Sequence, residues 1–234
     1  MTARHRSGRD LPGRLITFDG IEGSGKSTQL AVLSRALAAK GRSVVSTREP
    51  GGSPLGEGVR RLVLDPVFAG MSARAELWLY LAARADHVER VILPALASGA
   101  IVLCDRFSEA TIAYQGYGRG LPLDEVEAAV ELAAGGLRPD LVVLLDLPVE
   151  EGLRRVGERR LTNRLDLEST AFHQRVRDGY LALATREPDR IRVFDARRPL
   201  EELQRAVLAA VEPVCRSVVA GSAPSRMTVG RCLP

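Results

Sequence analysis

Residues 15–27 read LITFDGIEGSGKS, an apolar run that leads directly into the pattern G-x-x-x-x-G-K-S over residues 20–27. Residues 29–39 follow with leucine and alanine at three- and four-residue spacing, which predicts a helix. A glycine-rich loop between a strand and a helix can bind phosphate, because its backbone N–H groups converge on the phosphate oxygens and the helix N-terminus adds partial positive charge. The stretch therefore predicts a nucleoside triphosphate site, and the two flanking elements disfavour a chance match.

The residue types in this loop fit their expected contacts. Lys26 is long enough to reach the β- and γ-phosphates, and the hydroxyl of Ser27 can bind Mg²⁺. Glycine residues let the backbone approach the phosphates closely. We expect nucleotide contacts from the whole loop, which consists of Gly20, Ile21, Glu22, Gly23, Ser24, Gly25, Lys26 and Ser27.

Length and composition are typical of one soluble globular domain. The chain has 234 residues, 45% of them hydrophobic and 26% charged, and its 33 basic and 29 acidic residues give a net charge of +4. No basic stripe interleaved with aromatic residues is present, so nucleic acid is not an expected partner. No apolar run approaches about 18 residues, and the N-terminus lacks the apolar segment of a signal peptide, so we expect no membrane association.

The cysteines favour an intracellular protein. Cys104, Cys215 and Cys232 are odd in number and widely spaced, without a metal-ligand pattern. Cys104 ends an apolar run, where a small core side chain is expected. A reducing cytoplasm is the simplest interpretation of this usage.

Short apolar runs alternate with helical patterns along the chain. The predicted strands cover residues 14–18, 43–47, 100–104, 140–145 and 191–194, and the predicted helices cover residues 27–40, 72–97, 124–134, 149–159, 168–185 and 199–214. Strand runs that are apolar throughout indicate helices on both faces of the sheet, and the alternation indicates parallel strands with right-handed crossovers. The predicted fold is therefore a three-layer α/β P-loop NTPase fold with a five-stranded parallel sheet.

No repeat or low-complexity linker divides the chain. We expect a single domain over residues 14–214. The flanking segments, residues 1–13 and 215–234, are polar and rich in glycine, serine and proline, and we expect them to be disordered tails.

Charged residues follow three of the predicted strands. Asp19 precedes the glycine loop, Arg48 begins a turn that contains Pro50, and Asp105-Arg106 follows a buried run. Because ligands of parallel sheets gather at the carboxyl ends of the strands, we expect one shared site there. Asp105 is a candidate to hold Mg²⁺ or its water, and Arg106 to bind phosphate with two nitrogens. The alternatives are a surface salt bridge for this pair and a solvated side chain for Arg48.

Three motifs at these places closely resemble those of the thymidylate kinase family. They are T-R-E-P-G-G at residues 47–52, D-R-F at 105–107 and A-Y-Q-G-Y-G-R-G at 113–120, and the resemblance is collinear from about residue 14 to residue 211. Many families share the glycine loop, whereas this combination is highly specific. The resemblance implies transfer of the γ-phosphoryl group of ATP to dTMP, giving dTDP and ADP for dTTP synthesis, with Mg²⁺ and a short lid.

The resemblance also implies an acceptor site. Arg48 and Arg106 would grip the dTMP phosphate, and two cations suit this task because an anionic acceptor must approach an anionic donor. Glu22 would lie near the sugar 3′-hydroxyl, the alternative being a partner for the helix dipole. The implied dTMP-binding residues are Arg48, Tyr80, Arg84, Arg106, Thr111, Tyr114 and Gln115.

Tyr80 and Arg84 lie four residues apart on a predicted helix and therefore share a face. In the family, an aromatic ring here stacks on thymine and the arginine bonds O4 of the base. Tyr80 stands where phenylalanine is commoner, which keeps the ring and adds a hydroxyl that needs a partner. Ala110 departs from the usual serine and cannot make its hydrogen bonds. Tyr114 would lie under the sugar and exclude a 2′-hydroxyl.

Arg159, Arg160 and Arg164 surround a break between helical patterns that resembles the family's lid, at about residues 159–166. Because the interior of the glycine loop contains no arginine, the cation for the transition state must come from elsewhere. We expect Arg164, with Arg159 or Arg160, to close over the γ-phosphate; a solvated basic helix end is the alternative. The predicted catalytic residues are Lys26, Arg106, Arg164, Arg159, Arg160 and Glu22.

Two other functions fit part of the pattern. A small P-loop kinase for another nucleotide or a deoxynucleoside would share the loop, but the T-R-E-P-G-G turn and the Tyr80–Arg84 pair disfavour it. A GTP-dependent switch that binds protein partners is disfavoured because the chain has no Asn-Lys-x-Asp motif for reading guanine.

The family resemblance implies a homodimer. An apolar face formed by Val88, Val91, Ile92 and Ala95 would suit a subunit interface or core packing equally well. Trp78 is predicted to belong to the core. The segment at residues 195–197 resembles the family's segment beside the adenine of ATP.

Overall fold

A computed structural model describes residues 11–158 and 163–216. Its centre is a five-stranded parallel sheet in the order β2-β3-β1-β4-β5. The strands are β1 (Arg14–Asp19), β2 (Val44–Arg48), β3 (Ile101–Asp105), β4 (Leu141–Asp146) and β5 (Ile191–Asp195). The predicted fold class is therefore confirmed, and each predicted strand is present within one residue of its expected bounds.

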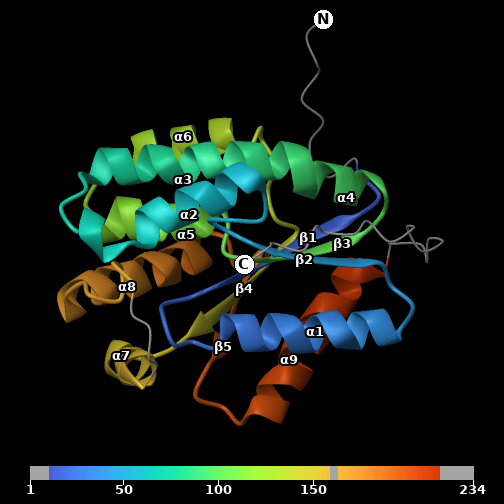
Figure 1. The fold of residues 1–234 in the computed structure, drawn as a ribbon. Coiled ribbons are helices and arrows are strands. Elements are labelled where there is room, and N and C mark those ends of the chain that lie inside the picture. The colour runs from blue at the N-terminus through green and yellow to red at the C-terminus, as the bar shows by residue number, and fades with distance from the viewer. Residues whose placement is uncertain (1–10, 159–162, 217–234) are drawn as a thin grey trace, which may run out of the picture.

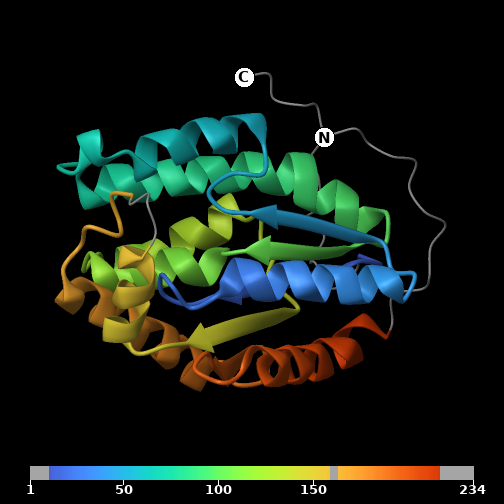
Figure 2. The same ribbon diagram turned by 60° about the horizontal axis from the view of Figure 1, so that its bottom comes forward.

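Helices cover both faces of the sheet (Figure 1). On one face lie α1 (Lys26–Ala39) and α9 (Leu200–Cys215), and on the other lie α3 (Ala73–His87) and α6 (Leu123–Ala133). Near the carboxyl ends of the strands lie α7 (Val149–Gly157) and α8 (Thr170–Arg186), as Figure 2 shows. Because helices cover both faces of the sheet, a ligand is expected to bind among the loops at the carboxyl ends of the strands.

Burial explains why the central strands are apolar throughout. Every residue of β3 except Asp105 is buried, and β1 and β4 are buried along all but one residue each. The edge strands β2 and β5 are partly exposed. Cys104 has no exposed surface, which confirms its predicted core position.

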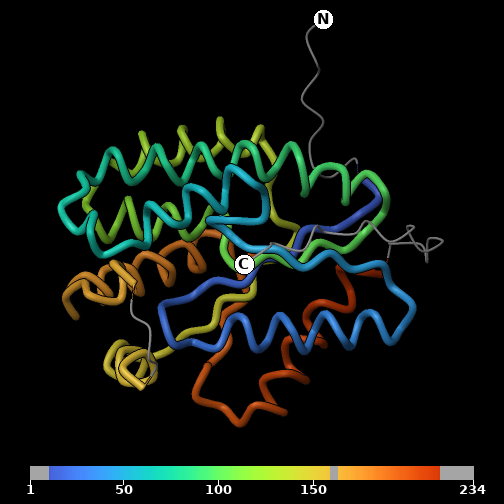
Figure 3. Tube along the Cα trace, in the orientation of Figure 1, coloured from blue at the N-terminus to red at the C-terminus, as the bar shows by residue number. Residues whose placement is uncertain are grey.

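The glycine loop is fixed by contacts that exclude side chains. The chain passes from β1 through the loop into α1 (Figure 3). Gly20 has a φ of 134°, and a Cβ there would lie 2.4 Å from the carbonyl oxygen of Leu145 on β4. Gly23 has a φ of 77°, and a Cβ there would lie 2.5 Å from the carbonyl oxygen of Gly152 on α7. The loop is therefore held between the sheet and α7.

Besides the short 3₁₀ helix η2 (Pro66–Phe68), two helical regions were not predicted from the sequence. The first is α2 (Pro54–Leu64), in which two glycines interrupt the helical pattern of the sequence. Two features indicate its start: the Ser53 hydroxyl accepts a hydrogen bond from the Gly56 N–H at 3.1 Å, and a proline occupies the first helical position. The second comprises α5 (Ser108–Thr111) and the π-helix η4 (Ile112–Gly118). The bounds of the remaining helices are η3 (Val88–Ile92) and α4 (Leu93–Ala97).

The packed region extends slightly beyond the predicted domain limits. Leu11 is buried, the Gly13 N–H donates to the Leu96 carbonyl at 2.9 Å, and Cys215 is buried as the last residue of α9. The remainder of both predicted tails, residues 1–10 and 217–234, lies outside the described residues. Within the described residues, no helix combines the length and apolar character that a membrane crossing requires.

The core prediction for Trp78 is wrong. Trp78 is 61% exposed, whereas its neighbour Leu77 is buried. The two side chains leave α3 in directions about 100° apart, so only one of them can face the sheet. The apolar face of Val88, Val91, Ile92 and Ala95 was expected to serve either a subunit interface or the core. Val88 and Ile92 are buried, so these two residues belong to the core.

The contact between α7 and the glycine loop can be tested with a matched pair of glycines. A Cβ at Gly152 would lie 2.7 Å from the Glu22 carbonyl oxygen, whereas a Cβ at Gly157, at the end of the same helix, meets no atom within 4 Å. Gly152→Ala should lower stability by about 1–3 kcal/mol through overpacking and weaken ATP binding. Gly157→Ala should leave both within error or slightly raise stability. Thermal melting and ATP titration measure these effects, and equal behaviour of the two variants would contradict the contact.

Candidate active site

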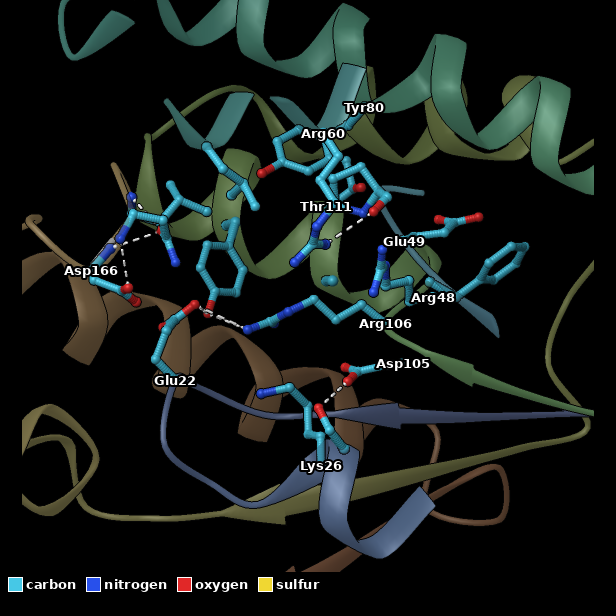
Figure 4. A pocket seen from close by; sticks show the side chains of 18 of the residues that line it. Glu22, Lys26, Arg48, Glu49, Arg60, Tyr80, Asp105, Arg106, Thr111 and Asp166 are labelled. Carbon is cyan, nitrogen blue, oxygen red and sulfur yellow. Dashed lines mark hydrogen bonds and ion pairs between the residues drawn. The ribbon is translucent and has the colours of Figure 1, made fainter. Parts of the chain in front are cut away.

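A cavity of about 330 Å³ lies at the carboxyl ends of the strands (Figure 4). It is lined by the glycine loop, the turn after β2, and residues of α2, α3, β3, α5, η4 and the segment that follows residue 162. The structure brings most of the predicted site residues together on its walls: Glu22, Gly23, Gly25, Lys26, Ser27, Arg48, Tyr80, Arg84, Asp105, Arg106, Thr111, Tyr114 and Gln115.

Lys26 is folded back into the glycine loop. Its ammonium group donates to the carbonyl oxygens of Gly20 and Ile21 at 3.0 and 2.8 Å, and it lies 3.4 Å from the Ser24 hydroxyl. These three residues belong to the loop without lining the cavity. Burial, and next the charge of Arg106, lowers the Lys26 pKa to about 8. A phosphate group here would restore a favourable partner for the ammonium charge.

Ser27 and Asp105 meet at the start of α1. The Ser27 hydroxyl donates to Asp105 Oδ2 at 2.7 Å. Oxygen donors of this kind suit Mg²⁺, which takes one or two protein ligands and completes its shell with waters and substrate phosphates. No cluster of three acidic, histidine or cysteine side chains exists among the residues described, so a dedicated protein cage is not offered there. The pair therefore fits a magnesium ion that arrives with a nucleotide.

Arg106 joins the loop to the rest of the cavity. Its Nη1 donates to the Gly20 carbonyl at 3.1 Å and to the Tyr180 hydroxyl at 3.0 Å, and its Nη2 donates to Glu22 at 3.0 Å and to the Tyr114 hydroxyl at 3.1 Å. Arg106 is the one non-glycine residue in the described chain with a positive φ, 71°. Such a backbone is strained and is maintained only where surrounding contacts impose it.

The pKa values of two carboxyl groups beside the loop are shifted in opposite directions. Glu22 accepts from the Tyr114 hydroxyl at 2.5 Å and lies 3.3 Å from His173 Nδ1. Burial acts to raise its pKa, but the His173 contact and the charges of Arg106 and Lys26 outweigh burial and hold that pKa well below the usual range. Asp19, by contrast, has its pKa raised to about 7 because burial dominates. Glu22 is therefore negatively charged at neutral pH, whereas Asp19 titrates near neutral pH.

The Arg84 side chain lines the cavity and has one guanidinium nitrogen without a partner among the described residues. It is 2% exposed, its Nε donates to Glu49 at 2.8 Å, and its Nη2 donates to the Phe107 carbonyl and the Thr111 hydroxyl, both at 2.9 Å. Its Nη1 has no hydrogen-bond partner within the described chain. Because an unpaired buried N–H is costly, this nitrogen marks a place for an acceptor on a ligand.

Glu49 was not singled out from the sequence as a site residue. It is buried between Arg84 and His87, whose Nδ1 lies 3.0 Å from Glu49 Oε1, and the other ring nitrogen of His87 lies 2.7 Å from the Thr47 hydroxyl. Its position inside the T-R-E-P-G-G motif could have indicated a role in the site. Glu49 thus orients Arg84 and joins the turn after β2 to α3.

Arg60 is a further cation on the cavity wall that was not predicted from the sequence. It lies on α2, lines the cavity, and donates from Nη1 to the Pro50 carbonyl at 3.0 Å. Arg48, on the same wall, is half exposed and pairs with Glu57 at 3.0 Å. Arg60 was missed because α2 itself was missed. The cavity therefore holds more positive charge opposite the loop than the two predicted arginines supply.

Arg164 does not line the cavity, in contrast to its predicted role. It is 2% exposed, its Nε donates to the Val63 carbonyl at 2.9 Å, and its Nη2 pairs with Glu76 on α3. Two of its three guanidinium nitrogens are thus bound to protein groups. The structure therefore does not bring Arg164 to the glycine loop as predicted, and its burial and ion pairing give it a structural role here.

The other residues near the predicted lid differ in how the structure places them. Arg159 and Arg160 lie outside the described residues. Asn163 and Asp166 line the cavity without having been predicted. Arg155 on α7 was also missed, and its Nη1 donates to the carbonyl of Gly23 in the glycine loop at 3.3 Å.

The sequence profile of one family, thymidylate kinase, matches residues 18–207 of the chain. The chain belongs to the thymidylate kinase family. It is 51% identical over 208 residues to the thymidylate kinase of Desulfovibrio desulfuricans, covering 86% of this chain and 96% of that one. It is 52% identical over 192 residues to the thymidylate kinase of Pseudomonas putida strain W619, covering 82% and 93% of the two chains.

A solved structure of the family has the same fold. The crystal structure of thymidylate kinase from Ehrlichia chaffeensis superimposes with a TM-score of 0.68 at 32% sequence identity. The match covers 86% of this chain and 98% of the other. The family membership suggested by the three motifs is thus confirmed across nearly the whole described chain.

Proposed function

We propose that the cavity holds ATP on the glycine loop and dTMP on the opposite wall, so that the two phosphates meet between them. As a member of the thymidylate kinase family, the protein transfers the γ-phosphoryl group of ATP to dTMP, giving dTDP and ADP. The observation that carries this arrangement is that Arg48, Arg60 and Arg106 line the same cavity as the loop glycines. Cations on the acceptor side offset the repulsion between the two anions.

The base end of dTMP is assigned to α3 and η4. Tyr80 offers its ring for stacking, and the unpaired Nη1 of Arg84 offers a donor for the base O4. Gln115 and Thr111 line the same part of the cavity. Tyr114, fixed by its hydrogen bond to Glu22, lies where it would exclude a 2′-hydroxyl and so favour deoxyribose.

Ser27 and Asp105 would hold Mg²⁺ at the nucleotide phosphates. The ion, when bound, neutralises charge on the β- and γ-phosphates. Asp105 lies at the end of β3, directly before Arg106, so one strand end supplies both the metal ligand and the phosphate clamp. Lys26 supplies a second positive charge at the phosphates once it leaves the loop carbonyls that it now contacts.

Catalysis in this site consists of positioning and electrostatic stabilisation. The acceptor phosphate is ionised at neutral pH, so no general base is required. Arg106 contacts the loop carbonyl of Gly20 and the carboxylate of Glu22, and so it can align the acceptor phosphate with the loop. Glu22 stays ionised and orients Arg106 and Tyr114. Closure of the lid would exclude water from the transferred group.

The transition-state cation is assigned to Arg159 or Arg160, since Arg164 is held by Glu76. Replacing both residues with alanine should lower the single-turnover rate by about two orders of magnitude or more at unchanged dTMP affinity. Arg164→Ala should instead lower the melting temperature, because it breaks a buried ion pair. If Arg164→Ala melted like the wild type and lost the rate, the original assignment of Arg164 would be restored.

The reaction itself is tested with a panel of acceptors. ADP release should be stimulated by dTMP, weakly by dUMP, and not by AMP or thymidine. A single methyl group in an apolar pocket is worth only about 1–3 kcal/mol, so some activity with dUMP is expected. Stimulation by AMP or thymidine instead would indicate a different small kinase. Hydrolysis that is indifferent to every acceptor would indicate a nucleotide-dependent switch.

We also propose a cytoplasmic homodimer. The cytoplasmic location is supported by the free, buried thiols of Cys104 and Cys215. The dimer is supported by large exposed apolar side chains on α2, η2 and α3, which are Leu55, Leu62, Val67, Phe68 and Trp78. Light scattering at micromolar concentration measures the mass, and a monomeric mass would contradict the dimer.

A further inference from the structure

Glu76 is a fully buried carboxylate in the first turn of α3. Its Oε1 accepts from Gln115 Nε2 at 2.8 Å and from Arg119 Nε at 3.1 Å, and its Oε2 accepts from Arg119 Nη2 at 3.1 Å and from Arg164 Nη2. Burial acts to raise the pKa of Glu76, but the hydrogen bonds from Arg119 and Gln115 outweigh burial and lower it. The group is therefore ionised at neutral pH and can only accept hydrogen bonds.

The carboxylate is held rigidly. Arg119 pairs on its outer side with Glu168 at 2.6 Å, and its guanidinium lies over the ring of Phe172 at 4.6 Å. Arg164 is fixed by the Val63 carbonyl and, through its backbone N–H, by the Leu64 carbonyl, both at 2.9 Å. Because both arginines are anchored elsewhere, Glu76 has little freedom to rotate.

A fixed acceptor at Glu76 determines which way the Gln115 amide points. An amide has a donor end and an acceptor end, and a carboxylate can bond only the donor end. Gln115 is 1% exposed and lines the cavity. With one N–H of its Nε2 bound to Glu76, Gln115 has its carbonyl oxygen at the end of the amide away from Glu76, and this oxygen is the acceptor that we infer it presents to a ligand.

The same face of α3 carries the other groups for the base. Glu76, Tyr80 and Arg84 follow one another at four-residue spacing and therefore form one stripe. Arg84 and Gln115 both line the cavity, so the unpaired Nη1 of Arg84 can serve as a donor and the oxygen of Gln115 as an acceptor for a ligand there. Thymine presents the complementary pair, a carbonyl at position 4 and an N–H at position 3. Cytosine presents the reverse, an amino group and a bare ring nitrogen.

We propose that Glu76 is a positioning residue for base selection, which fixes Gln115 with its oxygen toward the cavity and so makes the site accept a ring N–H and reject a ring nitrogen. The inference rests on the proposed placement of dTMP in this cavity. Glu76 contacts no substrate in this scheme and acts only through Gln115.

The experiment compares dTMP with 5-methyl-dCMP, which keeps the methyl group, sugar and phosphate and differs only at positions 3 and 4 of the base. The ratio of kcat/KM for the two acceptors is measured in the wild type, where it should be about 10³ or more. In Glu76→Gln the side chain at position 76 can itself donate, so Gln115 can turn. The ratio should then fall at least about tenfold, with a raised KM for dTMP and an unchanged KM for ATP.

Two further variants keep the test decisive. Glu168→Gln removes the outer partner of Arg119 and leaves the Glu76–Gln115 bond in place, so its ratio should stay within about twofold of the wild type. Glu76→Asp keeps the charge for both arginines but withdraws the carboxylate from Gln115 by one methylene. It should fold and lower the ratio even if Glu76→Gln proves too unstable to purify. Dissociation constants from calorimetry replace kinetic constants where turnover of 5-methyl-dCMP is too slow.

Equal losses toward both acceptors, with an unchanged ratio in the Glu76 variants, would overturn the inference and leave Glu76 as a purely structural anchor. A ratio in Glu168→Gln that falls as far as in the Glu76 variants would overturn it as well. Failure of the wild type to respond to dTMP at all would instead overturn the proposed placement of dTMP, so the two failures are distinguishable.

Discussion

A partly buried guanidinium with four hydrogen bonds joins the two halves of this site. Arg106 donates from Nη1 to the Gly20 carbonyl and the Tyr180 hydroxyl, and from Nη2 to the Glu22 carboxylate and the Tyr114 hydroxyl. Its left-handed backbone at the end of β3 is the strained element that aims the side chain back over the sheet edge. A donor loop and an acceptor wall from different segments are thereby held at a fixed separation, which a reaction between two anions requires.

The acceptor wall depends on a second set of buried charges. Glu49 orients Arg84 from the turn after β2, and Glu76 orients Gln115 from the start of α3. Each acidic residue binds a residue of the proposed base site and also a second side chain, which is His87 for Glu49 and Arg164 for Glu76. The recognition groups are thus fixed before a ligand arrives, which lowers the ordering cost of binding.

The sheet and the glycine loop could be predicted because the local sequence and its periodicity determine them, and the acceptor residues because three motifs resemble those of the thymidylate kinase family. Arg60 could not, because glycines at positions 56 and 58 and a leading proline hide α2. The orientation of Arg164 could not, since it lies in an irregular segment where no periodicity indicates which side chains point inward. Glu76 reads as an ordinary acid in a first helical turn, and its burial follows only from tertiary packing. Ion pairs between residues that are distant in the sequence are therefore the feature of this site that sequence patterns do not predict.

The most direct test of the central claim is the single-turnover rate of Arg106→Lys at saturating ATP and dTMP. Lysine keeps the positive charge but cannot bridge the loop carbonyl, the Glu22 carboxylate and two tyrosine hydroxyls at once. The account predicts a rate lower by about two to three orders of magnitude while ATP still binds on the loop with nearly its normal affinity. A rate within a few-fold of the wild type would contradict the claim that this guanidinium sets the geometry between donor and acceptor.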